Sequence, residues 1–335
     1  MKTKAKTTLH DVAAAAGVSI ATASKALNDV PVSAANKQKV LKAAAHLGYV
    51  ANETARALKR KRSHTIGLIF SETVATRQLG LLDAMSGALE SAGYSLICAT
   101  ARADANVYDV LMRRFLERRV DGLFCVTPPE RLASARDYRS AGIPIVVVTE
   151  RSQAVRDQPL VRPSIEEAVR TSLTEMVGLG HHRILALDDG AGNLGLTKID
   201  PRVRRRIDVD LIALSDAGSL DQLVQHQVLR PDSRPTLISA TLPYAEGVLA
   251  ACRAVGITIG VDLSVMALTN STNEQRAEQL DLSSLFIQPE LLGIAAAKQM
   301  LQLIDSKQVP KELTVEVGTW NPRGSVGRYP GSTKR

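Results

Sequence analysis

Apolar positions in the first fifty residues recur at intervals of three and four, the period of an amphipathic α-helix. The pattern predicts three short helices, over residues 9–16, 19–28 and 33–47. About three residues separate the first helix from the second, which is the length of the tight turn in a helix-turn-helix. The three helices share a small predicted core, formed by Leu9, Val12, Val18, Ala23, Leu27, Val40 and Leu47.

Local signals mark the ends of these helices. Thr8 and Asp11 have the spacing of a capping box, in which the Thr8 hydroxyl accepts a backbone N–H. The Asp11 carboxylate also favours the positive end of the helix. The remaining predicted ends are two serine N-caps and two terminating glycines: Ser19, Ser33, Gly17 and Gly48.

From Thr65 onward, short runs rich in Val, Ile and Leu alternate with amphipathic segments. Because these runs are apolar throughout, they predict parallel strands that are covered by helices on both faces. Nine such runs are too many for one small sheet, so the pattern predicts two α/β subdomains. The predicted strands are TIGLIF, YSLICAT, DGLFCVT, PIVVVT, RILALD, VDLIAL, PTLISA, LSVMALT and SSLFIQ.

Charge is distributed unevenly along the 335 residues. Residues 1–64 contain twelve of the 42 Lys and Arg but only three of the 34 Asp and Glu, whereas the remainder contains 30 basic and 31 acidic residues. The net charge of +8 therefore arises in the first fifth of the chain. This asymmetry favours a polyanionic partner for that part alone. A basic tail that only improves solubility is the alternative.

The cysteines and the hydropathy pattern favour a cytoplasmic protein. Cys98, Cys125 and Cys252 lie far apart in apolar runs, so we expect buried, reduced thiols without metal-site spacing. No apolar run approaches the roughly 18 residues of a membrane span. The charged N-terminus is not followed by the apolar stretch of a signal peptide. We therefore expect no membrane partner.

The segment VSIATASKALN, residues 18–28, consists mostly of small, uncharged side chains, whereas most exposed helices carry many charged ones. A helix of small residues can enter the DNA major groove, which is about 12 Å wide. In its first turns, Ile20 and Ala21 would contact thymine methyl groups, and Lys25 would donate to guanine. The hydroxyls of Ser19, Thr22 and Ser24 would bind phosphates. By itself such a helix could equally belong to a small bundle core, but the basic surroundings favour DNA.

TLHDVAAAAGVSIATASKALN, VSAANKQKVLKAAAHLGYVANETARALK and TIGLI together resemble the LacI/GalR family of bacterial transcriptional regulators. The resemblance is specific over residues 7–69 and looser through RRVDGLF, AGIPIVVV, LGHHRILAL and WNPRGS, to about residue 326. It implies an all-α helix-turn-helix DNA-binding domain, a hinge helix, and an α/β core that resembles periplasmic binding proteins, with two doubly wound subdomains. It also implies a dimer bound to a pseudo-palindromic DNA operator.

The family resemblance assigns roles to individual residues. It implies base reading by Ile20, Ala21 and Lys25, with Thr8, Ser19, Thr22, Ser24 and Asn28 at the DNA backbone. In the hinge it implies Asn52, Ala55, Arg56, Leu58 and Lys59, with Ala55 and Leu58 in the minor groove. The two Leu58 side chains of a dimer would kink the DNA. Family members usually have proline before the hinge asparagine, where this chain has Ala51.

The core departs from the family pattern for an effector that binds between the two subdomains. Thr241-Leu242 and Thr269-Asn270 stand where family members commonly hold sugar hydroxyls with amides and carboxylates. We therefore expect an effector that is not a simple neutral sugar: an anionic or less polar metabolite, or none. The candidate effector-binding residues, each of which could instead form ordinary surface contacts, are Ser71, Arg77, Arg151, Arg162, Thr241, Thr269, Asn270 and Gln288.

Other functions find less support in the sequence. The chain has neither a Walker-type phosphate loop nor an HExxH motif, and we expect no enzyme activity, cofactor or metal. The pair His181-His182 could bind a metal or act as a general base. Its position between Gly180 and a predicted strand is more typical of an ordinary loop. The alternatives are a solute-binding protein, judged from the core alone, and an architectural DNA-binding protein without sequence specificity or an effector.

The resulting domain division is a helix-turn-helix at 1–48, a hinge and linker at 49–64, and a core at 65–335. The predicted core subdomains are 65–162 with 291–319, and 163–290 with 320–335. The resemblance places the dimer interface on the LGLLDAMSGAL helix and its neighbours, with a tetramer also open. An effector would shift the population of hinge conformations and weaken or strengthen DNA binding.

Overall fold

The computed structural model divides the chain into two compact units, Met1–Ser63 and His64–Arg335. Each unit is described by itself below. The structure describes residues 7–28, 30–49, 62–70, 79–102, 104–129, 131–149, 158–188, 206–213, 220–223 and 236–329.

The first unit contains the three predicted helices: α1 (Leu9–Ala16), α2 (Ile20–Leu27) and α3 (Ala34–His46). The capping box is present, because Thr8 Oγ accepts from the Asp11 N–H while the Asp11 carboxylate accepts from the Thr8 N–H at 2.8 Å. Gly17 ends α1 in the left-handed conformation, φ 63°, where a residue without a Cβ is unstrained.

Small side chains form the core of this unit. Ala13, Ala23 and Ala26 are buried with Val12 and Val40, which lets three short helices approach closely. All seven predicted core residues belong to this cluster, four of them partly buried: Leu9, Val18, Leu27 and Leu47. The prediction succeeded because each helix has one apolar face and well-defined ends.

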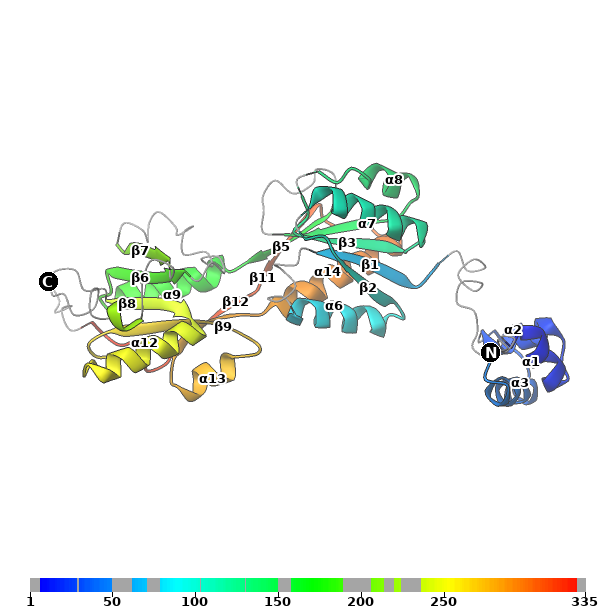
Figure 1. Cartoon of the computed structure of the whole chain (residues 1–335), viewed down its shortest axis with the longest axis horizontal. Helices are drawn as coiled ribbons and strands as arrows, with labels where there is room; N and C mark the ends of the chain where they lie inside the picture. Colours follow the sequence, from blue (N-terminus) through cyan, green and yellow to red (C-terminus); the bar gives the residue numbers. More distant parts are fainter. Residues whose placement is uncertain are drawn as a thin grey trace, which may run out of the picture. The chain divides into compact units, whose positions relative to one another are not determined.

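The second unit contains two six-stranded sheets. The first sheet has the order β11-β5-β4-β3-β1-β2, and all its strand pairs are parallel. Helices cover both faces of this sheet (Figure 1). Its strands are β1 (Thr65–Phe70), β2 (Ser95–Thr100), β3 (Gly122–Val126), β4 (Ile145–Val148), β5 (Leu160–Ser164) and β11 (Glu312–Glu316).

Alternate residues of the first sheet pack against different helices. Leu68 and Phe124 belong to the cluster that includes α6 (Leu79–Ser91) and α14 (Pro289–Ile304). Ile69 and Cys125 belong to the cluster on the opposite face, with α7 (Ala105–Glu117) and α8 (Ala135–Ser140). This two-sided burial explains why the central strands are continuous apolar runs.

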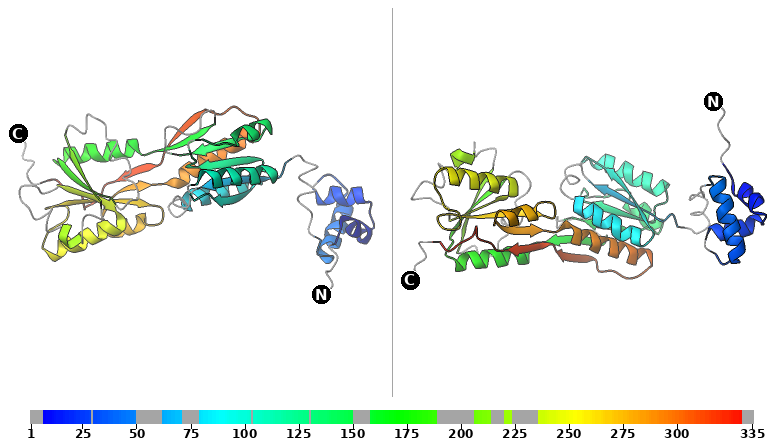
Figure 2. Two further views of the ribbon diagram at one scale, coloured as in Figure 1. Left: turned by 45° about the horizontal axis from the view of Figure 1, so that its top comes forward. Right: turned by 90° about the horizontal axis from the view of Figure 1, so that it is seen from below.

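The second sheet has the order β12-β10-β9-β8-β6-β7, with only β12 antiparallel to its neighbour. Its strands are β6 (Arg183–Asp188), β7 (Asp208–Ala213), β8 (Leu237–Thr241), β9 (Ser264–Asn270), β10 (Ser283–Ile287) and β12 (Gly318–Asn321). Figure 2 shows α9 (Glu166–Gly178, green) and α12 (Leu242–Ala254, yellow) on opposite faces. The short helices α11 (Leu220–Leu223) and α13 (Glu274–Gln279) complete the described elements.

The predicted α/β class is confirmed, and all nine predicted strands are present. Strands β5, β11 and β12 were not predicted, because they lie at or next to a sheet edge and are short or polar. The prediction of a buried thiol is correct for Cys125 and Cys252 but wrong for Cys98, which is exposed. Cys98 lies on the edge strand β2, so an apolar run there does not imply burial on both faces. No helix of the described segments is long and apolar enough to cross a membrane.

His181 joins the C-terminal segment to the second sheet. Its ring is buried, and Nε2 donates to the Gly327 carbonyl at 2.9 Å. Gly327 N donates in turn to Ser264 Oγ at 3.1 Å, and the Tyr329 N–H donates to the Leu179 carbonyl. His182 is exposed, with its ring edge-on to Tyr329. The pair therefore has a packing role in this structure.

Burial lowers the pKa of His181, and the hydrogen bond to the Gly327 carbonyl only partly opposes this effect. Within the described residues Nδ1 has no hydrogen-bond partner, as suits a neutral ring. The unfolded chain binds this proton near pH 6.5, whereas the folded protein binds it only at lower pH. Stability from neutral His181 is therefore complete above about pH 7 and is lost as the pH falls below about 6.5.

We expect His181→Gln to flatten the pH dependence of unfolding between about pH 7.5 and 5.5. The measurement is the urea midpoint of wild type and variant across this range. Equal slopes for wild type and His181→Gln would contradict the assignment.

Candidate nucleic-acid interface and effector edge

Helix α2 presents one exposed face. Ile20 is 49% exposed, and Ala21 and Lys25 are also exposed, whereas Ala23 and Ala26 on the opposite face are buried. Because residues four apart share a helix face, Ala21 and Lys25 stack one turn apart, next to Ile20. The structure thus brings together the three predicted base-reading residues.

The polar residues of α2 fix its ends. Ser19 Oγ accepts from the Thr22 N–H at 3.1 Å and lies 2.9 Å from Thr22 Oγ1. At the other end, Asn28 Nδ2 donates to the Ser24 carbonyl at 2.6 Å. These bonds pair polar groups at the two ends of α2 and stabilise the helix that carries Ile20, Ala21 and Lys25. Phosphate contacts by these side chains remain a prediction.

Thr8 is exposed at the start of α1, where its backbone and side chain both bond to Asp11. The backbone bond from Thr8, followed by the bond from its hydroxyl, lowers the pKa of Asp11. Asp11 therefore stays ionised beside the positive end of α1. The predicted hinge residues Asn52, Ala55, Arg56, Leu58 and Lys59 lie outside the described residues, as do Ser71, Arg77 and Arg151.

Four of the candidate effector positions, Thr269 among them, meet at the carboxyl edge of the second sheet, where β8, β9 and β10 end. Thr241 ends β8, Asn270 ends β9, and Gln288 follows β10. These strands are neighbours, with Thr241 opposite Leu268 and Ile287 opposite Asn270. Ligands of open α/β sheets bind at such edges. Arg162 lies apart from this group, in β5 of the first sheet, where its Nε donates to Glu312 Oε1 at 2.8 Å.

The carboxyl edge of the second sheet is already hydrogen-bonded to itself. Thr269 Oγ1 donates to Glu274, and the Asn270 side-chain oxygen accepts from both the backbone and the hydroxyl of Thr272 at 3.0 and 2.6 Å. The Asn270 N–H donates to Asn273 Oδ1 at 2.7 Å. An effector that uses these groups must therefore replace bonds that the folded chain makes.

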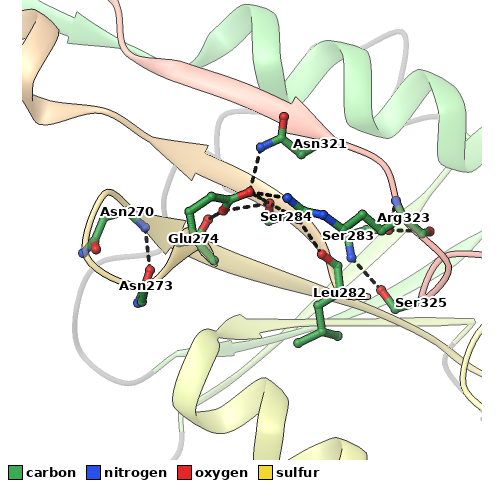
Figure 3. A network of polar contacts seen from close by, with 10 residues as sticks. Asn270, Asn273, Glu274, Leu282, Ser283, Ser284, Asn321, Arg323 and Ser325 are labelled. Carbon is green, nitrogen blue, oxygen red and sulfur yellow. Dashed lines mark hydrogen bonds and ion pairs between the residues drawn. The ribbon is translucent and has the colours of Figure 1, made fainter. Parts of the chain in front are cut away.

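Glu274 is the centre of a polar network that joins α13, β9, β10 and β12 (Figure 3). Its Oε1 accepts from Arg323 Nη2 at 2.7 Å and from Asn321 Nδ2 and Ser284 Oγ at 2.8 Å. Arg323 Nη1 donates to the Leu282 carbonyl at 2.7 Å. The sequence gives no signal of this network, because its partners lie up to 49 residues apart.

The network determines the ionisation of Glu274. Burial raises its pKa, but the hydrogen bonds from Thr269, Arg323, Ser284 and Asn321 together outweigh burial and lower it. The carboxylate therefore stays charged, and the Arg323–Glu274 pair is largely shielded, with side chains 17% and 16% exposed. Shielded, hydrogen-bonded ion pairs are costly to break because one charge is left unpaired.

We expect Glu274→Gln to destabilise the protein by about 2 kcal/mol, since it leaves Arg323 without its counter-charge. Chemical denaturation at pH 7 measures the change. Glu167→Gln is the matched control, because its pair with Arg170 is exposed on both sides and should contribute less than about 0.5 kcal/mol. Equal effects of the two variants would mean that the network adds no more than a surface ion pair.

Two family descriptions match the chain. Residues 8–52 match "Bacterial regulatory proteins, lacI family", and residues 175–326 match "Periplasmic binding protein-like domain". The chain is 29% identical to the HTH-type transcriptional regulator MalR of Streptomyces coelicolor, over 98% of this chain and 99% of that protein. It is 26% identical to the transcriptional repressor PurR of Pectobacterium carotovorum, over 90% and 91% of the two chains.

Solved structures show the same fold. The lac repressor dimer bound to operator and the anti-inducer ONPF is similar, with a TM-score of 0.73 at 24% identity, covering 96% of this chain and 99% of that chain. The regulator CelR in complex with cellobiose has a TM-score of 0.54 at 21% identity, covering 96% and 100%.

Proposed function

Because the chain belongs to the LacI family of bacterial transcriptional regulators, we propose that it represses transcription as a homodimer on a pseudo-palindromic DNA operator. The domain division 1–48, 49–64 and 65–335 is part of this proposal. Its place of action is the cytoplasm, where the bacterial chromosome lies.

The exposed face of α2 is the observation that carries the proposal. Ile20 and Ala21 are exposed apolar side chains outside the buried cluster of their unit, and Lys25 is a cation beside them. Such a face matches a major-groove surface of thymine methyl groups and guanine acceptors. The excess of positive charge in residues 1–64 supplies the attraction to phosphates.

The hinge is the second part of the proposal. Asn52, Ala55, Arg56, Leu58 and Lys59 would order on DNA, with the paired Leu58 side chains inserted at the central base step. Without the proline that family members carry at position 51, this segment would depend more strongly on DNA for its order.

The effector is the third part. We place it at the carboxyl edge of the second sheet, with Thr241, Thr269, Asn270 and Gln288, and with Ser71, Arg77, Arg151 and Arg162 from the remainder of the core. Hydroxyl and amide groups that are already bonded within the chain offer little to the vicinal hydroxyls of a neutral sugar. We therefore favour an anionic or less polar metabolite, or DNA binding that needs no effector.

A thermal-shift screen of metabolites tests the effector class. We expect stabilisation by an acid or a less polar compound, because a ligand that binds only the folded protein raises its melting temperature. Saturable stabilisation by an unmodified hexose or disaccharide at micromolar concentration would contradict the proposal.

Selection of binding sites from a random duplex library tests DNA recognition itself. We expect a two-fold symmetric site that is bound about 10³-fold or more tightly than random duplex at physiological salt. An architectural protein would instead bind all duplexes alike, and the selection would return no symmetric site.

We expect Lys25→Ala to cost about 1–3 kcal/mol at the selected site and to relax the preference at one base pair. Titrations against the site and its single-base variants measure both effects. Arg253→Ala, which removes an exposed arginine from α12 of the core, is the control and should leave affinity unchanged. A uniform loss on every duplex would mean that Lys25 contacts phosphate only.

A further inference from the structure

The first sheet has one edge at which all its strands begin, which we call the amino edge. Because every strand pair is parallel, the segments that lead into the strands meet there. The linker enters the core at the same edge, since His64 directly precedes β1. The His64 N–H donates to Asp121 Oδ2 at 2.8 Å, and the Ser95 N–H donates to the His64 carbonyl at 2.9 Å.

The amino edge is basic. Its described loop residues, 64, 92–94, 118–121, 141–144, 158–159 and 305–311, contain four Lys or Arg and two Asp. Both aspartates already have partners: Asp121 accepts from His64, and Asp305 lies 3.8 Å from Lys307. Residues 65–335 have no basic excess, so this concentration is local. The exposed basic side chains are Arg118, Arg119, Lys307 and Lys311.

Acidic side chains of the adjoining helix ends lie nearby but do not reverse the balance. Glu90 and Glu117 lie in the last turns of α6 and α7, opposed by Arg114 and Arg139 in the last turns of α7 and α8. Cations near helix C-termini also interact favourably with the helix dipole. This interaction with the helix dipoles therefore accounts for part of the positive charge at the amino edge.

A second feature of the amino edge is the left-handed backbone of Arg119. Helices α6, α7, α8 and α14 end at the amino edge with the same turn, in which the residue after the C-cap is left-handed. Gly93 and Gly142 occupy this position after α6 and α8, whereas α7 has Arg119 with φ 55° and α14 has Ser306 with φ 58°. A residue with a Cβ is strained there and glycine is not. Both strained residues lie in the loops that carry the exposed cations, and the strain at Arg119 points to a function of its side chain.

We propose that the amino edge, through Arg118, Arg119 and Lys311, contacts the DNA phosphate backbone beside the operator. The inference rests on the proposed DNA-binding function and adds the core as a second point of attachment. Continuity with the basic residues 59–62 supports DNA over an acidic protein as the occupant.

A short length of chain tethers the amino edge to the DNA-binding unit. Thirteen residues, 50–62, connect Tyr49 to Ser63. A tethered second contact acts at a high effective concentration, so weak phosphate interactions contribute measurably. Such contacts carry no sequence information, and they strengthen binding to every duplex alike.

The test uses the full-length protein and a duplex of about 40 base pairs that carries the selected site, titrated by anisotropy over a range of KCl concentrations. We expect Arg118→Gln/Arg119→Gln to lower the slope of log affinity against log salt by about one for each phosphate that the variant no longer binds. At about 100 mM salt, binding to operator and random duplex should fall about tenfold alike. Arg206→Gln/Arg253→Gln, which removes two exposed arginines of the second-sheet half, is the matched control.

A single variant separates the DNA contact from a structural role. Arg119→Gly should raise the melting temperature by about 2 °C, because it relieves the left-handed strain, while it lowers the salt slope. Higher stability with an unchanged slope would overturn the proposal, as would a double variant that matches its control. Those results would leave operator selection by the wild type intact. A wild type that selects no operator would instead contradict the proposed function.

Discussion

The parallel register of the first sheet decides where each kind of chemistry lies. Because the strands run in one direction, their beginnings form one edge and their ends another. The beginnings receive the linker and the basic loops around Arg118 and Arg119. In the second sheet, the same rule brings Thr241, Asn270 and Gln288 to one edge although they are distant in sequence. Both proposed ligand surfaces therefore follow from strand direction.

The self-bonded carboxyl edge changes what an effector must do. At Thr269 and Asn270 the folded chain already satisfies the polar groups, so a ligand gains only the difference between new and existing hydrogen bonds. Glu274 and Arg323 hold the neighbouring backbone in place at the same time. Selectivity would then depend on shape and charge more than on the number of polar contacts.

Local features of the fold could be predicted from the sequence and distant pairings could not. The Thr8–Asp11 capping box and the Gly17 turn depend on a few adjacent residues, and both were identified. The central strands were recognised because burial on both faces leaves them continuously apolar. The edge strand β2, which contains Cys98, is similarly apolar but less buried, so its composition led to a wrong prediction of burial for Cys98.

The candidate site shows the same limit. The exposed face of α2 follows from helical periodicity, and Ile20, Ala21 and Lys25 lie on it as predicted. The bond from Thr269 to Glu274 depends on the turn that joins β9 to α13, and the bond from Arg162 to Glu312 on a contact across 150 residues. No pattern in a single sequence reveals such partners, so residue type alone overstated how available Thr269 and Arg162 are to a ligand.

The two halves of the core are joined by three separate chain crossings, at β5 to α9, β10 to α14 and β11 to β12. One proteolytic nick in any crossing would leave two covalent connections, so the halves would stay together. Three crossings side by side also oppose twisting and sliding of one half against the other more than they oppose bending about the line that the crossings share. The two halves of the core should therefore move relative to one another mainly by bending about the line that the three crossings share.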